Sequence, residues 1–231
     1  MHILPRAIGL VVPTIRESRP AGNVRDHLVH TGKKAMNAST YARFRIGLPR
    51  LERRYPWLSL ILDCYAVIDA SVEAAINLAP GKPACKEGCA SCCCQPIPLT
   101  PLEAAGMKLY VRNEMPAATQ GILVTRLASK DPADTRCPFL LAGSCAIYQL
   151  RPVACRRYMV LGQPCLEDED ATATRPGDIL RPSRAALRFA MALTLPYYAA
   201  LGEKIPEPEQ AFAFCAECSV ILRQTARTIL G

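Results

Sequence analysis

Histidine is scarce in this sequence, and its scarcity limits the kinds of metal site that the chain can form. Only three histidines occur among 231 residues, and all of them (His2, His27 and His30) lie near the start of the chain. Zinc and iron are bound in proteins chiefly by imidazole, thiolate and carboxylate groups. We therefore expect any metal site in the rest of the chain to depend on thiolates, which twelve cysteines can supply.

The sequence also lacks a hydrophobic run long enough to cross a bilayer. The most apolar stretch of the later chain, residues 185–201, is too short and is interrupted by Arg188 and Pro196. The opening residues MHILPRAIGLVVPTIRESRP lack the long apolar segment and the small-residue cleavage site of a secretory signal. We expect a cytoplasmic protein without a membrane span, whose thiols stay reduced and do not form a disulfide framework.

Two kinds of catalytic motif are missing as well. The chain has no Gly-rich loop of the kind that holds S-adenosylmethionine, and no His/Asp/Ser arrangement for nucleophilic catalysis. At 231 residues and 50% hydrophobic composition, the chain can bury a substantial core without covalent staples. The cysteines therefore do not compensate for a small core, and the catalytic residues, if any, stay unknown.

Charge is concentrated at the start of the chain. Residues 1–56 hold eleven Lys or Arg against three acids, whereas residues 57–231 hold seventeen of each, so the formal charge of +8 lies entirely in the first segment. This segment contains several prolines and no sustained apolar period. We interpret it as a basic, poorly ordered arm; contact with nucleic acid through residues 1–56 is a possible alternative that we do not favour.

From residue 57 onward the pattern is helical. Residues 57–79 place apolar side chains at steps of three and four, and Pro80 ends the run. Further helices are expected at residues 101–112, 117–130, 183–202 and 207–230, with loops between residues 132 and 181. The expected fold class is mainly α: residues 57–231 form a single irregular helical domain with long loops, organised around a cysteine-ligated metal site.

Five of the twelve cysteines fall within ten residues, in the stretch CKEGCASCCCQP. In a helical or near-helical path, Cys85, Cys89, Cys92 and Cys93 would share one face, whereas Cys94 would point elsewhere. The spacing of the first three also matches that of radical S-adenosylmethionine enzymes. We do not favour that interpretation, because those enzymes continue with a series of βα units and this chain continues with helices and loops.

Four more cysteines follow at intervals of eight or ten residues: Cys137, Cys145, Cys155 and Cys165. Cys-Pro and Arg-Pro steps near them oppose regular helix and favour loops that can fold thiolates toward a common centre. Distant thiolates of this kind, added to a closely spaced group, are typical of zinc and iron–sulfur sites. Cys94 and the helical pair Cys215 and Cys218 are less favoured as ligands.

Four sequence boxes resemble a known family. They are GCASCC at residues 88–93, IPLTPLEA at 97–104, CPFL at 137–140, and CxIYxxRPxxCR at 145–156. In this order they are similar to the CxxCxxCC, or YkgJ-type, cysteine-cluster proteins, which are expected to chelate zinc or iron. The resemblance covers about residues 85–165. It implies a metal-binding set of Cys85, Cys89, Cys92, Cys93, Cys137, Cys145 and Cys155, with Cys165 as an eighth member.

All-thiolate ligation suits an iron–sulfur cluster and zinc alike, and we place iron–sulfur, as [4Fe-4S], slightly ahead. Eight ligands could build two four-thiolate zinc sites, or one cluster and one structural zinc; a single [4Fe-4S] cluster needs fewer. Arg151 and Arg156, which flank Cys155, could donate hydrogen bonds to sulfur and offset its negative charge. Tyr158 is expected to pack beside the same site.

Three functional hypotheses remain. The first is a metal-binding cysteine-cluster protein of unknown biological role. The second is a protein-modifying methyltransferase or a redox enzyme, because the domain is similar to part of flagellin lysine N-methylases. The third is a zinc-stabilised interaction module whose basic arm binds nucleic acid or an acidic partner. The first is favoured, because the sequence is specific about the metal ligands and not about a reaction or a partner.

Overall fold

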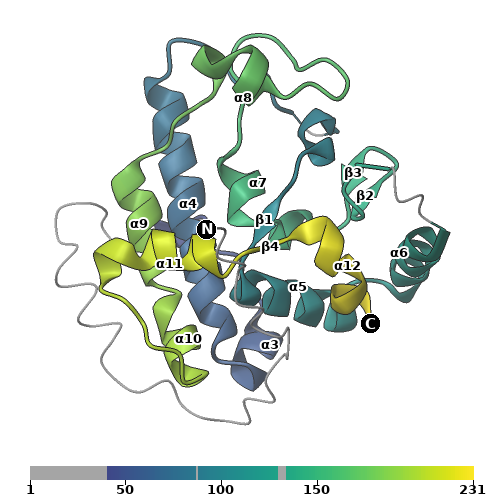
Figure 1. Ribbon diagram of the computed structural model, residues 1–231, viewed down its shortest axis with the longest axis vertical. Coiled ribbons are helices and arrows are strands. Elements are labelled where there is room, and N and C mark those ends of the chain that lie inside the picture. Colours follow the sequence, from purple (N-terminus) through teal and green to yellow (C-terminus); the bar gives the residue numbers. More distant parts are fainter. Residues whose placement is uncertain (1–40, 87, 130–133) are drawn as a thin grey trace, which may run out of the picture. The chain divides into compact units, whose positions relative to one another are not determined.

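The computed structural model describes residues 41–86, 88–129 and 134–231. Helices dominate these residues, and the strands are only two residues long, as Figure 1 shows. The prediction of a mainly α fold is therefore confirmed. The described chain divides into two compact units, each built from stretches that are distant in sequence. Unit 1 comprises residues 41–74, 100–102 and 182–219, and unit 2 comprises residues 75–99, 103–181 and 220–231.

The predicted boundary at residue 56 falls inside unit 1. Positions 1–40 of the predicted arm lie outside the described residues, but its last part is structured and contains α3 (Pro49–Arg54). Leu51 is buried there, and the Arg45 guanidinium pairs with Glu52 and Asp63, each at 2.5 Å. The single domain over residues 57–231 stays a prediction.

The long helix of unit 1 forms where the apolar period predicted it. Helix α4 (Leu58–Leu78) nearly matches the expected 57–79. Its buried side chains include Leu58, Leu62 and Tyr65, which follow one another at steps of three and four. Cys64 is also buried on this helix.

A row of aromatic rings links other parts of unit 1. The centroid of Trp57 lies 5.5 Å from that of Tyr197, Tyr197 lies 5.4 Å from Tyr198, and Tyr198 lies 5.2 Å from Phe214. The last two pairs meet edge to face, which is a favourable arrangement for aromatic rings. Packing of apolar side chains is thus a main source of stability in this unit.

The prediction of a single helix over residues 183–202 is wrong. The structure has two shorter helices there, α9 (Arg184–Ala192) and α10 (Leu195–Ala200). Ser183 caps α9 by accepting a hydrogen bond from the amide of Ala186 at 3.3 Å. The break follows from Pro196, which lacks an amide hydrogen and is accepted only in the first turn of a new helix.

The prediction of a single helix over residues 207–230 is also wrong. This region folds as η4 (Pro208–Gln210), α11 (Ala211–Glu217), β4 (Val220–Ile221) and α12 (Leu222–Leu230). The interruption occurs because β4 pairs in antiparallel fashion with β1 (Pro98–Leu99), as Figure 1 shows. Two β-branched residues, which suit extended backbone, supply that pairing.

Unit 2 contains most of the short elements. The predicted helices at 101–112 and 117–130 are confirmed as α5 (Pro101–Asn113) and α6 (Ala117–Ser129), although residue 130 lies outside the described residues. The expected loop region is divided by short elements: β2 (Leu140–Leu141), β3 (Ser144–Cys145), η2 (Tyr148–Leu150), α7 (Val153–Arg157), α8 (Ala171–Thr174) and η3 (Pro176–Asp178).

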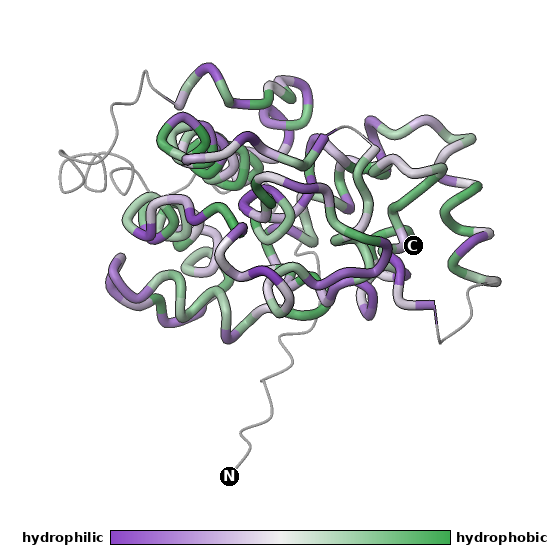
Figure 2. The backbone as a smooth tube through the Cα atoms, turned by 90° about the horizontal axis from the view of Figure 1, so that it is seen from above, coloured by the Kyte–Doolittle hydropathy of each residue, from purple (hydrophilic) through white to green (hydrophobic). Residues whose placement is uncertain are grey.

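Hydrophobic and hydrophilic residues are interspersed along the helices, as Figure 2 shows. This is the pattern of helices that bury one side and expose the other. Among the described residues, no helix combines the length and the apolar character needed to span a membrane.

Candidate metal centre

The cysteines are distributed unequally between the two units. All eight predicted ligands lie in unit 2, together with Cys94, whereas Cys64, Cys215 and Cys218 lie in unit 1. No disulfide joins any of the twelve cysteines, all of which the structure describes. The predicted ligands are therefore brought into one compact unit as thiols.

The closely spaced cysteines do not follow a continuous helix. Only η1 (Ser91–Cys94) is helical, with the tight 3₁₀ geometry. Before it the chain turns: the amide of Cys89 donates to the carbonyl of Lys86 at 3.0 Å, and Gly88 has a φ of +78°. A positive φ suits glycine and breaks a regular helix. The helical face proposed for the four thiols is therefore wrong, and turns in the backbone determine their directions.

Pairing of two distant backbone segments positions Cys85. The amide of Ala84 donates to the carbonyl of Val160 at 2.8 Å, and the amide of Val160 donates to Sγ of Cys85 at 3.3 Å. Burial raises the pKa of Cys85, and the thiolates of Cys89 and Cys92 raise it further. Three of the predicted ligands thus lie within electrostatic reach of one another.

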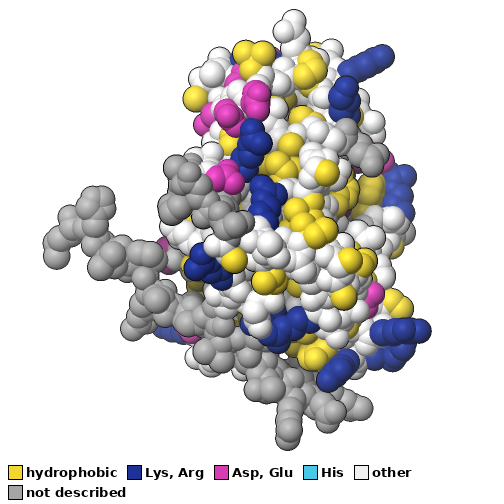
Figure 3. Space-filling view, turned by 90° about the vertical axis from the view of Figure 1, so that its right-hand side faces the viewer, with side chains coloured by type: hydrophobic (Ala, Val, Ile, Leu, Met, Phe, Trp, Pro, Cys, Tyr) yellow, Lys and Arg dark blue, Asp and Glu magenta, His cyan; other side chains and the backbone are white. Residues whose placement is uncertain are grey.

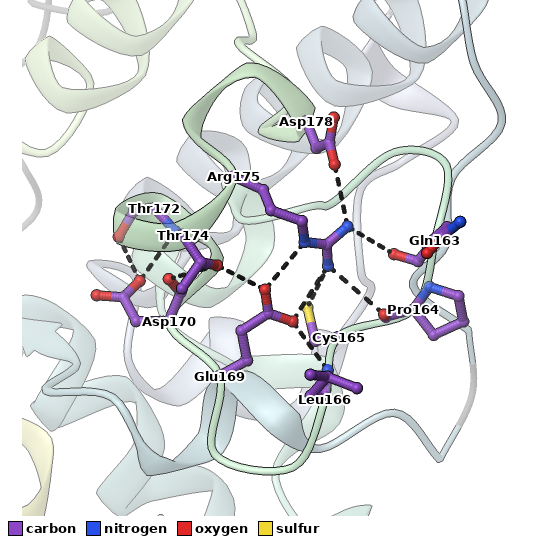
Figure 4. A network of polar contacts seen from close by, with 10 residues as sticks. All are labelled: Gln163, Pro164, Cys165, Leu166, Glu169, Asp170, Thr172, Thr174, Arg175 and Asp178. Carbon is purple, nitrogen blue, oxygen red and sulfur yellow. Dashed lines mark hydrogen bonds and ion pairs between the residues drawn. The ribbon is translucent and has the colours of Figure 1, made fainter.

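Cys165 lies in a loop that Arg175 holds together (Figure 4). The guanidinium donates to Glu169 at 2.9 Å, to Asp178 at 3.0 Å and to Sγ of Cys165 at 3.8 Å. It also donates to the backbone carbonyls of two residues that precede the cysteine, Gln163 and Pro164. The loop is therefore fixed around the thiol, and the sequence prediction missed Arg175 because nothing in its local sequence indicates these partners.

The charges in this network shift the acidity of its members. Hydrogen bonds from Arg175, Thr174 and the amide of Leu166 lower the pKa of Glu169 to about 2. Burial raises the pKa of Cys165, followed by the charge of Glu169. Arg175 lowers the same pKa, so the arginine favours the thiolate that a metal would require.

A direct backbone hydrogen bond joins Cys137 to the first cysteine group. The amide of Cys137 donates to the carbonyl of Cys93 at 2.6 Å. Beyond it, β2 and β3 form a hairpin in which Leu140 pairs with Cys145, and the turn contains Gly143 at a φ of +79°. These contacts bring the backbone of Cys137 close to that of Cys93, 44 residues earlier, and to that of Cys145, 8 residues later.

The short helix α7 carries Cys155 and is fixed at both ends. At its start, the buried carboxylate of Glu103 accepts a hydrogen bond from the amide of Val153 at 2.7 Å. At its end, the buried guanidinium of Arg156 donates to the carbonyls of Arg151 (3.0 Å) and Gln149. Burial raises the pKa of Cys155, and the thiolates of Cys137, Cys92 and Cys145 raise it further, in decreasing order of effect.

Cys92 affects the pKa values of several other predicted ligands. A hydrogen bond with Cys93 raises its pKa, followed by burial, whereas Arg151 lowers it. Its thiolate in turn raises the pKa values of Cys85, Cys145 and Cys155. Cys92 is therefore within electrostatic reach of Cys85, Cys145 and Cys155.

Two hydrogen-bond donors beside the thiols are buried and have no hydrogen-bond partner among the described residues. They are Nε of Arg151 and the hydroxyl of Tyr158. The Arg151 guanidinium lies 4.1 Å from the ring centroid of Tyr148, and its charge lowers the pKa values of Cys92 and Cys145. Burial, followed by nearby thiolates, raises the pKa of Tyr158 to about 12. Both groups are thus available to donate to an acceptor that the protein itself does not supply.

The three cysteines that were less favoured as ligands have local partners. The thiol of Cys94 donates to the carbonyl of Ser91 at 2.9 Å. In unit 1, Sγ of Cys215 lies 3.6 Å from Oγ1 of Thr194, and the thiol of Cys218 donates to the carbonyl of Cys215 at 3.4 Å. Their positions require no metal.

The thiols of unit 2 are near one another but do not form a coordination polyhedron. Among the described residues, no three His, Cys, Asp or Glu side chains are arranged to hold one metal ion. The chemistry of the donors nevertheless fits a thiophilic metal, because zinc and iron–sulfur clusters are bound by sets of thiolates from separate segments. The mutual effects on pKa also fit, since neighbouring thiolates repel one another unless a cation lies between them.

Residues 84–176 match a family model with the description "CxxCxxCC: Putative zinc- or iron-chelating domain". The matched segment contains all eight predicted ligands, and also Arg151, Arg156, Tyr158 and Arg175. It is less than half of the chain, and it excludes the three cysteines of unit 1. The resemblance expected from the sequence boxes is confirmed. No curated protein and no solved structure matches the chain.

Proposed function

We propose that this protein binds metal through the cysteine thiolates of residues 84–176, and that the metal is an iron–sulfur cluster of the [4Fe-4S] type rather than zinc. The match of this segment to a zinc- or iron-chelating family carries the proposal. The gathering of all eight predicted ligands in unit 2, where the thiolates affect one another, supports it.

In this proposal, the ligands are Cys85, Cys89, Cys92, Cys93, Cys137, Cys145, Cys155 and Cys165. The charges of Arg151 and Arg175 favour the thiolate forms of the cysteines beside them. A bound iron–sulfur cluster would supply one-electron redox chemistry. The residues of the chain would hold its irons, donate hydrogen bonds to its sulfurs and limit the access of water.

The preference for iron–sulfur over zinc rests on the two donors without partners. Nε of Arg151 and the hydroxyl of Tyr158 are buried beside the thiols. An iron–sulfur cluster adds inorganic sulfides as hydrogen-bond acceptors, and hydrogen bonds to sulfur tune the reduction potential of such clusters. A zinc site would offer these donors only the cysteine sulfurs.

The methyltransferase and nucleic-acid hypotheses have less support. A pocket beside the thiols lined by Arg156 and Tyr158 would favour an enzyme, but the buried guanidinium of Arg156 donates to two backbone carbonyls. In the face shown in Figure 3, the described Lys and Arg side chains form small separate groups with hydrophobic side chains between them. Residues 1–40 of the predicted basic arm, 1–56, lie outside the described residues. Both hypotheses stay predictions.

Anaerobic purification followed by analysis of metal and acid-labile sulfide tests the proposal. We expect iron and sulfide in equal amounts and a brown protein with broad visible absorption. Cys94→Ser should keep the same iron content, because its thiol has a local backbone partner. Colourless protein with zinc and no sulfide would reject the iron–sulfur assignment, and protein that retains no metal would reject the proposed function altogether.

A further inference from the structure

A closed loop, residues 161–178, carries Cys165. The amide of Leu161 donates to the carbonyl of Asp178 at 2.8 Å, and the two residues just outside this pair form an antiparallel β-bridge. The loop therefore begins and ends at one place in unit 2. Cys165 lies near the start of the loop and Arg175 lies near its end, so contacts between them join its two halves.

Apolar packing does little to hold the first half of this loop. Leu166, the residue after the thiol, is 76% exposed, and the side chain of Glu167 is 81% exposed. Residues 162–164, which lead to the cysteine, are exposed as well. Asp168 has a φ of +58°, which is uncommon for a residue other than glycine. The conformation around the thiol must therefore come from polar contacts.

The guanidinium of Arg175 supplies these contacts on the near side of the thiol, as Figure 4 shows. Nη1 donates to the carbonyl of Gln163 at 3.2 Å, and Nη2 donates to the carbonyl of Pro164 at 3.5 Å. Nη2 also donates to Sγ of Cys165 at 3.8 Å. One side chain thus holds both the backbone that leads to the cysteine and the sulfur itself.

Glu169 extends this hold to the far side of the thiol. Its carboxylate accepts from Nε of Arg175 at 2.9 Å and from Nη2 at 3.2 Å, which is the strong two-bond geometry of an arginine–carboxylate pair. The same carboxylate accepts from the amide of Leu166 at 2.8 Å. The Glu169 side chain is only 9% exposed, so water screens this pair less than an ordinary surface pair. Both neighbours of Cys165 are therefore fixed by Arg175 and its partner.

The arginine is itself fixed to the base of the loop. Nη1 of Arg175 donates to the carboxylate of Asp178 at 3.0 Å, and Asp178 is the residue whose carbonyl closes the loop. The planar fork of a guanidinium can make all of these bonds at once, which a lysine ammonium cannot. The position of the thiol thus depends on one arginine that is anchored where the loop closes.

We infer that Arg175 is the positioning residue for Cys165 in the proposed metal centre, and that its hydrogen bond to the sulfur persists when the metal is bound. The inference rests on the proposed function, and it adds a residue outside the predicted ligand set on which metal binding depends. Both residues lie in the segment that matches the chelating family. Residues that hold a metal ligand by hydrogen bonds typically contribute about 10–100-fold to metal affinity.

Chelator competition with Cd²⁺ as the probe tests the inference, because thiolates favour soft metal ions. The full chain is reduced, freed of metal and loaded anaerobically with Cd²⁺, and a chelator is then added until half of the ion is removed. Arg175→Gln should bind Cd²⁺ about 10–100-fold more weakly than the wild type. Arg181→Gln is the matched control, because it removes the same charge from an exposed arginine of the same unit, and it should bind like the wild type.

A double-mutant cycle separates positioning of the ligand from a general role in folding. Cys165→Ser alone should weaken the binding of Cd²⁺. Adding Arg175→Gln to Cys165→Ser should weaken it no further, because the arginine acts through that thiol. Losses that add together would overturn the inference, as would unchanged binding in either single variant.

Arg175→Lys covers the case in which Arg175→Gln fails to fold. Lysine keeps the positive charge but lacks the planar fork, so it cannot hold the backbone, the carboxylate and the sulfur together. We expect weaker binding of Cd²⁺ than in the wild type, again with no further loss when Cys165→Ser is present. Binding equal to that of the wild type would overturn the inference, because charge alone would then be sufficient. A wild-type chain that binds no Cd²⁺ overturns the proposed function instead.

Discussion

The two units of this protein differ in the length of their elements and in their content of cysteine. Unit 1 is built around α4 and α9 and buries large apolar and aromatic side chains, including Leu58, Leu62 and Tyr198. Unit 2 contains two-residue strands and helices as short as four residues, and it holds nine of the twelve cysteines. Elements this short cannot bury enough apolar surface to be stable by themselves. Unit 2 also buries large apolar side chains, among them Leu123, Phe139 and Leu150, so the two units differ in their short elements and in their thiols rather than in the presence of a core. We expect the proposed metal to join the short elements of unit 2.

Non-local polar contacts position the loops of unit 2. In unit 2, arginine side chains bind backbone carbonyls far away in sequence: Arg227 binds that of Leu127, and Arg112 binds that of Gly231. A buried carboxylate, Glu103, binds an amide 50 residues away. These contacts position loops, but exposed ion pairs and hydrogen bonds each contribute little stability. We therefore expect bound metal to be the main stabilising element of this unit.

Removal of metal should have the largest effect on stability, and it should affect unit 2 and not unit 1. Chelation under reducing conditions is expected to unfold the segment from Cys85 to Cys165, because thiolate ligation and folding are coupled. Helix α9 and the part of α4 in unit 1 should keep their protection, since apolar packing holds them. Hydrogen exchange measured by mass spectrometry would show both. Unchanged protection and an unchanged melting temperature over the cysteine segment would contradict this prediction.

A cavity in unit 1 should destabilise that unit without changing the metal content. Leu62 is fully buried on α4, so Leu62→Ala is expected to reduce the free energy of unfolding by about 2–5 kcal/mol. Metal content per folded chain should stay the same, because the change is far in sequence from every predicted ligand. Chemical denaturation and metal analysis of the same sample measure the two quantities. The exposed Leu78 of the same helix provides the control, and Leu78→Ala should cost far less. Loss of metal in Leu62→Ala would show that the units are not independent.

Removal of the buried carboxylate of Glu103 should destabilise unit 2 by less than Leu62→Ala destabilises unit 1. Glu103 accepts a hydrogen bond from the first amide of α7, and Glu103→Leu leaves that amide without this partner. We expect a loss of about 1–3 kcal/mol in the free energy of unfolding, measured in the metal-bound protein. Exposed Glu114, on the residue after α5, provides the matched control as Glu114→Leu. Equal stability of the two variants would rule out this role for Glu103.

Alkaline pH should destabilise unit 1 gradually through Tyr197. Burial raises the pKa of Tyr197 from 10.0 to about 12, so the unfolded chain loses this proton first. The stabilising effect is complete below pH 10 and is lost as pH rises toward 12, by about 1.4 kcal/mol per pH unit. Denaturation curves of wild type and Tyr197→Phe between these pH values measure the difference. Parallel curves for the two proteins would show that Tyr197 does not titrate in this way.

The sequence predicted those parts of the fold that depend on neighbouring residues. Helices α4, α5 and α6 follow from apolar periodicity and from breakers such as Pro80, and their ends fall within about two residues of the expected positions. The expected helix at 207–230 failed because the extended conformation of Val220 and Ile221 depends on pairing with β1, more than 100 residues earlier. Local propensity cannot reveal such a partner.

The candidate site shows the same division. Spacing and residue type were enough to select eight cysteines, and the family match covers all of them. The sequence could not show that Arg175 binds Cys165 or that Glu103 holds α7. The placement of the thiols also depends on turns at Gly88 and Gly143 and on backbone bonds between distant segments.

The sequence by itself therefore determined the kind of protein this is: a mainly α chain, poor in histidine, whose cysteine-rich segment matches the model of a zinc- or iron-chelating domain. Ligand chemistry and helical periodicity are properties of residue types and their spacing, so they can be read along the chain. Only the tertiary structure decided which thiols are neighbours and which unit they belong to. The reason is physical, because proximity between distant residues is produced by long-range packing and hydrogen bonds rather than by local preference.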